Sequence, residues 1–130
     1  MRIASFIAQY LLGLLFTFSG LNGFFHFAPM PPKPPLATEF LHALMASHYV
    51  VAVFVLQFSS GVLFLANRYI PLALTLIGPV IVNILLFHLS MDPAGIVPGA
   101  IAAVCWLLVF YRVRHVFAGI FRHHVHEPAR

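Results

Sequence analysis

The chain alternates between long apolar runs and short polar breaks, and this pattern predicts its helices. Four runs come near the ~20 residues that a helix needs to cross a ~30 Å hydrocarbon core. Polar and apolar positions do not alternate within the runs, and an isolated open sheet cannot span lipid, so strands are a poor alternative to helices. We predict an all-α four-helix bundle over 1–117, with helices at about 3–27, 38–66, 70–90 and 96–117.

The breaks between the runs carry turn chemistry. The segment "APMPPKPPLA" has too many prolines for a helix and predicts a stiff, extended loop. Thr38 is placed to cap the following helix, with Glu39 in its first turn. The segment "ANRYIP" predicts a tight turn with Pro71 in the first turn of the third helix, and "SMDPAG" predicts the break before the fourth.

Composition decides the class of protein. The 130 residues are 62% hydrophobic and 8% charged, whereas a soluble domain has about 25% charged residues. A soluble fold of this size has too little interior to hide so much apolar surface. We therefore expect an integral membrane protein. The first apolar run is too long for a signal peptide and no small-residue cleavage site follows it, so we expect it to be retained.

The distribution of charge predicts the orientation in the membrane. The net charge is +4, and Lys33 alone lies on one side of the predicted spans. The other side holds Arg2, Arg68, Arg112, Arg114, Arg122 and Arg130. Because basic residues concentrate on the cytoplasmic side, we expect a multi-pass inner-membrane protein with both termini and a basic, His-rich tail over 118–130 in the cytoplasm. We expect Arg112 and Arg114 to extend to the lipid interface, and no binding of nucleic acid.

Polar side chains inside the predicted spans are the candidate site. Asn22 and His26 share a face of the first helix, Gln57 lies in the second, and Asn83 and His88 lie in the third. Polar groups in lipid are costly and face the bundle or a cavity. Two interpretations remain open: a polar pocket for a ligand, or hydrogen bonds that only tie the helices together.

Metal binding and catalysis have little support in the sequence. His42 and His48 are the candidate metal ligands, but they are six residues apart and do not share a helix face at ligand spacing. The single Cys105 excludes a CxxC pair within one chain. We find no phosphate-binding loop, nucleophile elbow or HExxH motif, which leaves enzymatic activity undecided.

Three stretches resemble a known family. The segments "YLLGLLFTFSGLNGFF", "QFSSGVLFLANRYIPLAL" and "GPVIVNILLFHL" are similar to helices of small DoxX-like integral membrane proteins, and the resemblance covers about 10–112. It implies a four-helix membrane bundle and a redox-associated role. By the same resemblance Asn22, Gln57, Asn83 and His88 match polar positions of the family. Position 57 is often acidic there, so Gln57 is a departure that removes a proton acceptor.

Pattern and resemblance together favour one function and leave a second open. The first is a redox-associated membrane subunit that binds a quinone-like ligand through Asn22, Gln57 and Asn83, with His26 and His88 at the outer mouth. Phe24, Phe25 and Phe87 would supply apolar walls. The alternative is a non-catalytic scaffold or interaction protein. Expected partners are the lipid bilayer, a redox subunit or further copies of the chain; neither haem nor metal is expected.

Overall fold

Helices make up the computed structural model, which describes residues 2–26, 28–125 and 128. No strand occurs among these residues, so the all-α prediction is confirmed. Four residues of the predicted tail, 126–127 and 129–130, lie outside the described residues, as do Met1 and Phe27. The elements are α1 (Arg2–Phe25), α2 (Pro35–Ala46), α3 (Val50–Ala66), α4 (Ile70–Met91), η1 (Pro93–Gly95), α5 (Ile96–Val113) and η2 (Arg114–Phe121), where η marks a 3₁₀-helix.

The single helix predicted over 38–66 is wrong, because α2 and α3 are separate and meet at an angle of 86°. Ser47 causes the break. Its hydroxyl donates to the Leu44 carbonyl (3.2 Å) and accepts the Tyr49 N–H (3.3 Å), which offers the backbone an alternative to helical bonds. His48 then adopts a left-handed φ of 62°, a conformation that an α-helix does not contain.

The predicted helix ends also shift. α2 begins at Pro35, where a missing N–H costs nothing, so Thr38 lies inside the first turn and does not cap it. The Thr38 hydroxyl donates to the Pro34 carbonyl at 3.1 Å. At the other end of the chain, α5 stops at Val113, and η2 continues to Phe121, four residues into the segment 118–130 that was predicted as a tail.

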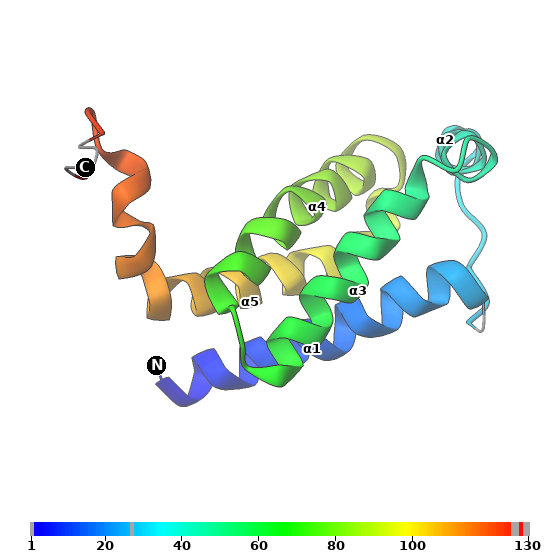
Figure 1. Ribbon diagram of the computed structural model, residues 1–130. Coiled ribbons are helices and arrows are strands. Elements are labelled where there is room, and N and C mark those ends of the chain that lie inside the picture. Colours follow the sequence, from blue (N-terminus) through cyan, green and yellow to red (C-terminus); the bar gives the residue numbers. More distant parts are fainter. Residues whose placement is uncertain (1, 27, 126–127, 129–130) are drawn as a thin grey trace.

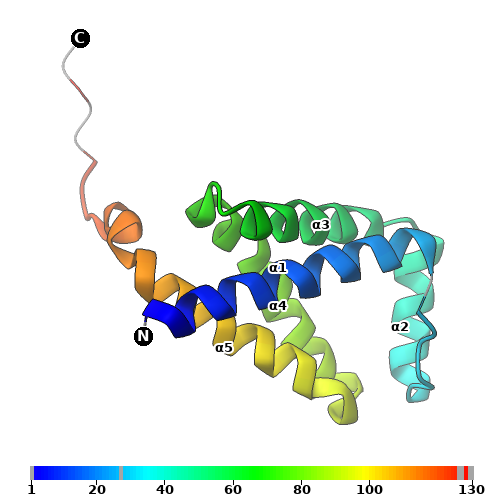
Figure 2. The same cartoon turned by 90° about the horizontal axis from the view of Figure 1, so that it is seen from below.

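The long helices run between two ends of the molecule. Arg2, the α3–α4 turn and the end of α5 lie at one end, and α2 and η1 lie at the other (Figure 1). α1 lies alongside α3 over most of its length (Figure 2). α1 also packs on α5, while α4 packs on both α3 and α5. α2 lies across the far end and makes few contacts with the bundle (Figure 2).

Glycines allow the close approach of α1 and α3. A Cβ added at Gly20 would lie 2.7 Å from the Phe58 backbone nitrogen and 2.9 Å from the Phe54 carbonyl oxygen. A Cβ at Gly13 would lie 3.1 Å from the Leu65 backbone nitrogen. Small residues at such positions are typical of helix pairs in membranes.

The outside of the bundle is as apolar as its core. Buried side chains such as Phe16, Phe64 and Leu74 form the core. Large apolar side chains also cover the surface, and Ile3, Leu14, Leu86, Leu89 and Val97 are each more than half exposed. Three helical segments are long and apolar enough to cross a membrane, namely α1, α4 and the segment from η1 through η2. The bent pair of α2 and α3 is a fourth candidate.

Candidate ligand pocket between α2, α3 and α4

A cavity of about 400 Å³ opens between α2, α3 and α4 at the end of the molecule where α2 lies. We call it the amide pocket, because two side-chain amides, those of Gln57 and Asn83, stand among mostly apolar residues. The cavity is partly open to the surface. Its lining consists of Phe40, Leu41, Leu44, Tyr49, Val50, Val53, Phe54, Gln57, Val80, Asn83, Ile84, Leu86, Phe87, Ser90 and Met91.

Gln57 is the buried polar group of the amide pocket. The residue is 8% exposed, and its Oε1 has no hydrogen-bond partner among the described residues. An unpaired buried oxygen typically costs about 1–3 kcal/mol. Gln57 also lines the cavity, so a ligand there would contact this residue.

Asn83 approaches the same cavity from α4. Its Nδ2 donates to the Pro79 carbonyl at 2.9 Å, and the residue is exposed. Pro79 lies inside α4 and lacks an N–H, so the helix loses one backbone bond there. The amide of Asn83 is thus held against its own helix, and among the described residues its Oδ1 has no hydrogen-bond partner. That oxygen is available to a ligand in the pocket.

Next to the pocket, an ion pair that was not predicted from the sequence links the proline loop to the end of α4. Lys33 of the proline loop pairs with Asp92 after α4, with Nζ and Oδ2 2.9 Å apart. Both side chains are at most 15% exposed. Lys33 Nζ also lies 5.9 Å from the ring centre of Phe87, a lining residue. In the sequence, this pair was indicated by opposite charges on two loops that were predicted at the same end of the bundle.

His88 takes part in this ion-pair cluster and does not line the amide pocket. Its Nδ1 lies 3.1 Å from the Asp92 carbonyl oxygen and 3.7 Å from Oδ2. Its ring meets the neighbouring Phe87 ring edge-on at 5.1 Å. His88 therefore orders the turn beside the pocket.

Asn22 and His26 lie away from the amide pocket, so the expected cluster of Asn22 with Gln57 and Asn83 does not form. The Asn22 side-chain oxygen accepts the Ala28 N–H at 2.8 Å, and its backbone carbonyl accepts the His26 N–H at 2.8 Å. Asn22 thus terminates α1. His26 is exposed, with a left-handed φ of 52°. Helical periodicity predicts which face of the first helix carries Asn22, but it does not predict the hydrogen bond of Asn22 to the following loop.

Of the three aromatic residues expected in the wall, Phe87 lines the pocket and Phe24 and Phe25 do not. Phe87 lines the pocket and stacks at a tilt on Phe40 of α2, with ring centres 5.7 Å apart. Phe24 packs edge-on against the lining residue Phe54 at 5.8 Å and so supports the wall from behind. Phe25 is 70% exposed and takes no part in the wall.

The candidate metal ligands His42 and His48 are exposed on α2 and at the α2–α3 break. Within 2–26, 28–125 and 128, no group of three or more His, Cys, Asp or Glu side chains is placed to hold a metal ion.

A second polar cluster, the arginine network, lies at the opposite end of the bundle. Arg112 of α5 donates to Ser5 Oγ at 3.0 Å and to Gln9 Oε1, both on α1. Gln9 is fully buried and donates to the Phe64 carbonyl (3.0 Å) and Asn67 Oδ1 (2.9 Å). Arg112 therefore also has a structural role that the sequence analysis did not predict, because the network ties α5 to α1 and α3. In the sequence, the i, i+4 spacing of Ser5 and Gln9 indicates a shared polar face at the start of the first helix.

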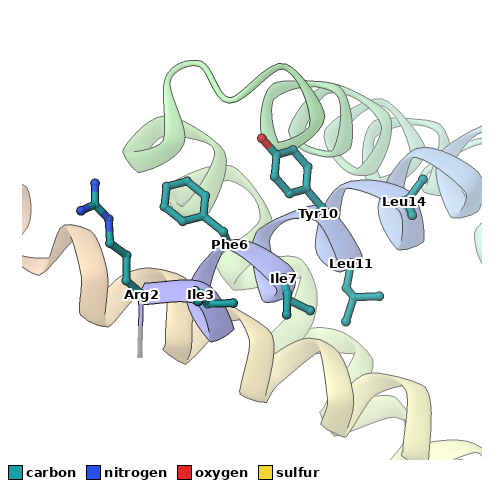
Figure 3. Close-up of a pocket in the computed structure, with 7 residues that line it drawn as sticks. All are labelled: Arg2, Ile3, Phe6, Ile7, Tyr10, Leu11 and Leu14. Atoms are coloured by element: carbon teal, nitrogen blue, oxygen red, sulfur yellow. The ribbon is translucent and has the colours of Figure 1, made fainter.

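A shallow groove follows the outer face of α1 at this same end. We call it the α1 groove; it is lined by Arg2, Ile3, Phe6, Ile7, Tyr10, Leu11 and Leu14 (Figure 3). All of these residues come from one helix, so the groove is a surface feature and not a cavity between helices.

Comparisons with known proteins add no assignment: no protein-family model, curated protein or solved structure matched this chain.

Proposed function

We propose that this chain is an integral membrane protein that binds a quinone-like ligand in the amide pocket. In this proposal α1, α4 and α5 cross the inner membrane, and α3 crosses it with α2 lying along the outer surface. The apolar exterior and the lengths of the helices support the insertion. The 86° bend supports the surface position of α2, because a helix perpendicular to a spanning helix lies in the membrane plane.

The unpaired Gln57 oxygen is the observation that carries the proposed ligand class. Apolar and aromatic walls suit a ring or an alkyl chain, and the amides of Gln57 and Asn83 are polar groups that would orient it. A reduced quinone carries two ring hydroxyls, one for Gln57 Oε1 and one for Asn83 Oδ1.

The redox-associated role rests on the DoxX-like resemblance of 10–112. The pocket residues bind and orient such a ligand, and a partner subunit would exchange electrons with it. Gln57, as a neutral amide, holds the hydroxyl proton in a hydrogen bond and does not remove it.

The alternative is a scaffold whose polar groups only tie the helices together. The arginine network favours it, because Arg112, Gln9 and Ser5 link three helices without lining the amide pocket. Asn22 likewise serves the end of its own helix. In the first function Gln57 binds a ligand, and in the alternative it only ties helices together. The test therefore substitutes Gln57.

The test measures binding of a short-chain quinol to the detergent-solubilised protein. Gln57→Leu should weaken binding about fivefold to tenfold, the effect of one lost hydrogen bond. Ser60→Ala is the matched control, because Ser60 Oγ is also buried and unpaired on α3 but does not line the pocket. Equal affinities for wild type and Gln57→Leu, or no binding to wild type, would contradict the ligand proposal and favour the scaffold.

A further inference from the structure

The end of the bundle that holds the arginine network has an unbalanced positive charge. Arg2, Arg68, Arg112 and Arg114 lie there, on α1, the α3–α4 turn, α5 and the start of η2. Of the three carboxylates in the chain, Glu39 and Asp92 lie at the opposite end, and Glu127 lies outside the described residues. Among the described residues, no acidic side chain pairs with any of these arginines.

Arg112 is held in place with part of its donor capacity unused. A guanidinium has five N–H groups. Ser5 and Gln9 accept two of them, and the others meet no acceptor among the described residues. The guanidinium carbon lies 3.9 Å from the ring centre of Phe6, which fixes its plane against α1. A fixed guanidinium with unused donors suits an external oxyanion.

Arg2 brings a second positive charge to the same place. Arg112 packs on Phe6, which lies one helical turn after Arg2 on α1, so both arginines lie at the start of α1. Arg2, Phe6 and Tyr10 project from one side of α1 (Figure 3). Two like charges held together by the fold, with no described counter-charge, are stabilised by an anion between them.

The α1 groove leads away from these charges toward the middle of the bundle. It runs from Arg2 past Ile7 and Leu11 to Leu14. The helix rises about 18 Å over the twelve steps from Arg2 to Leu14, at 1.5 Å per step, and one leaflet of a bilayer core is about 15 Å thick. The groove thus has the length of one acyl chain.

We propose that the α1 groove and the arginines at its end form a binding site for one anionic phospholipid. The phosphate lies between Arg2 and the outward N–H groups of Arg112. One acyl chain follows Ile3, Ile7, Leu11 and Leu14. The site rests on the proposed membrane insertion, and it is independent of the amide pocket at the other end.

The experiment is native mass spectrometry of the full chain in detergent with added phosphatidylglycerol or phosphatidylcholine. Wild type should retain one phosphatidylglycerol more tightly than phosphatidylcholine. Arg2→Gln should weaken phosphatidylglycerol binding about fivefold, the effect of one basic residue near an anionic headgroup. Arg2 makes none of the hydrogen bonds of the network, so the fold should persist. Arg122→Gln, with the same loss of charge beyond η2, is the matched control and should bind as wild type.

Several outcomes would overturn the site. They are equal affinities for both lipids, wild-type affinity in Arg2→Gln, or an equal loss in Arg122→Gln. Glycerol 3-phosphate that binds as tightly as the lipid would identify a free-phosphate site. A lipid-independent dimer that Leu11→Trp dissociates would identify a second copy as the occupant of the groove. Quinol binding, measured on the same Arg2→Gln sample, should stay unchanged and so separates failure of this site from failure of the amide pocket.

Discussion

At the residue scale, three side-chain amides that all lie within predicted membrane-spanning helices have different roles. Gln57 is buried with an unpaired oxygen, Asn83 is held against the Pro79 carbonyl, and Asn22 terminates its helix. Helical periodicity assigns each amide to a helix face but says nothing of its bonding partner. The partner is a nearby backbone group in two of the cases, the Ala28 N–H after α1 for Asn22 and the Pro79 carbonyl one turn earlier in α4 for Asn83.

Gln57 is expected to lower the stability of the ligand-free protein. Its unpaired buried oxygen carries a desolvation cost, so Gln57→Leu should raise the free energy of unfolding by about 1 kcal/mol. Titration of the detergent-solubilised protein with SDS measures this change. A loss of stability in Gln57→Leu would mean that the amide ties helices together, as in the scaffold alternative.

The Lys33–Asp92 ion pair should stabilise the end of the molecule next to the amide pocket. Lys33→Met leaves the Asp92 carboxylate, 8% exposed, without its cation and should cost about 3 kcal/mol of unfolding free energy. Glu39→Gln, an exposed carboxylate on α2, is the control and should change stability by less than about 0.5 kcal/mol. Equal effects of the two substitutions would show that the ion pair is not structural.

At the element scale, the sequence predicts where helices exist better than where they end. Apolar runs located the parts of the chain that became α1, α3, α4 and α5. Residues 47–49, Ser-His-Tyr, are a short polar interruption inside the second apolar run, and there the local bonds of Ser47 divide α2 from α3. Apolar residues continue on both sides of this interruption, which is why the run was interpreted as one helix.

The packing of α1 on α3 should depend on glycine. Gly20→Ala would place a Cβ 2.7 Å from the Phe58 backbone nitrogen, which cannot move without moving α3. We expect a loss of about 1–3 kcal/mol in unfolding free energy from this overpacking. Gly119→Ala is the control, because no atom lies within 4 Å of an added Cβ there. Comparable SDS denaturation curves for the two variants would contradict the close packing of α1 and α3.

At the scale of the whole molecule, charge and hydropathy predicted the grouping of elements but not the polar links inside it. The segments that carry arginines, namely the start of α1, the α3–α4 turn and the end of α5, lie at one end of the bundle, as the distribution of charge suggested. The pairing of Arg112 with Ser5 and Gln9 joins positions more than a hundred residues apart. Such pairs follow from the crossing of α1 and α5, which no local pattern encodes.

The proposed orientation predicts which segments are accessible from outside an intact cell. In a Cys105→Ala background, a membrane-impermeant maleimide should label Pro32→Cys in intact cells and Arg122→Cys only after permeabilisation. Labelling of both positions in intact cells, or of neither after permeabilisation, would contradict the topology with the proline loop outside and η2 inside.

The identity of the small molecule that the purified protein retains tests the central claim most directly. Mass spectrometry of an organic extract should find a quinone-class molecule in wild type at close to one per chain. Gln57→Leu should retain about tenfold less, and Ser60→Ala as much as wild type. A wild-type extract that contains phospholipid and no quinone-class molecule, or equal retention by wild type and Gln57→Leu, would contradict the proposed function of the amide pocket.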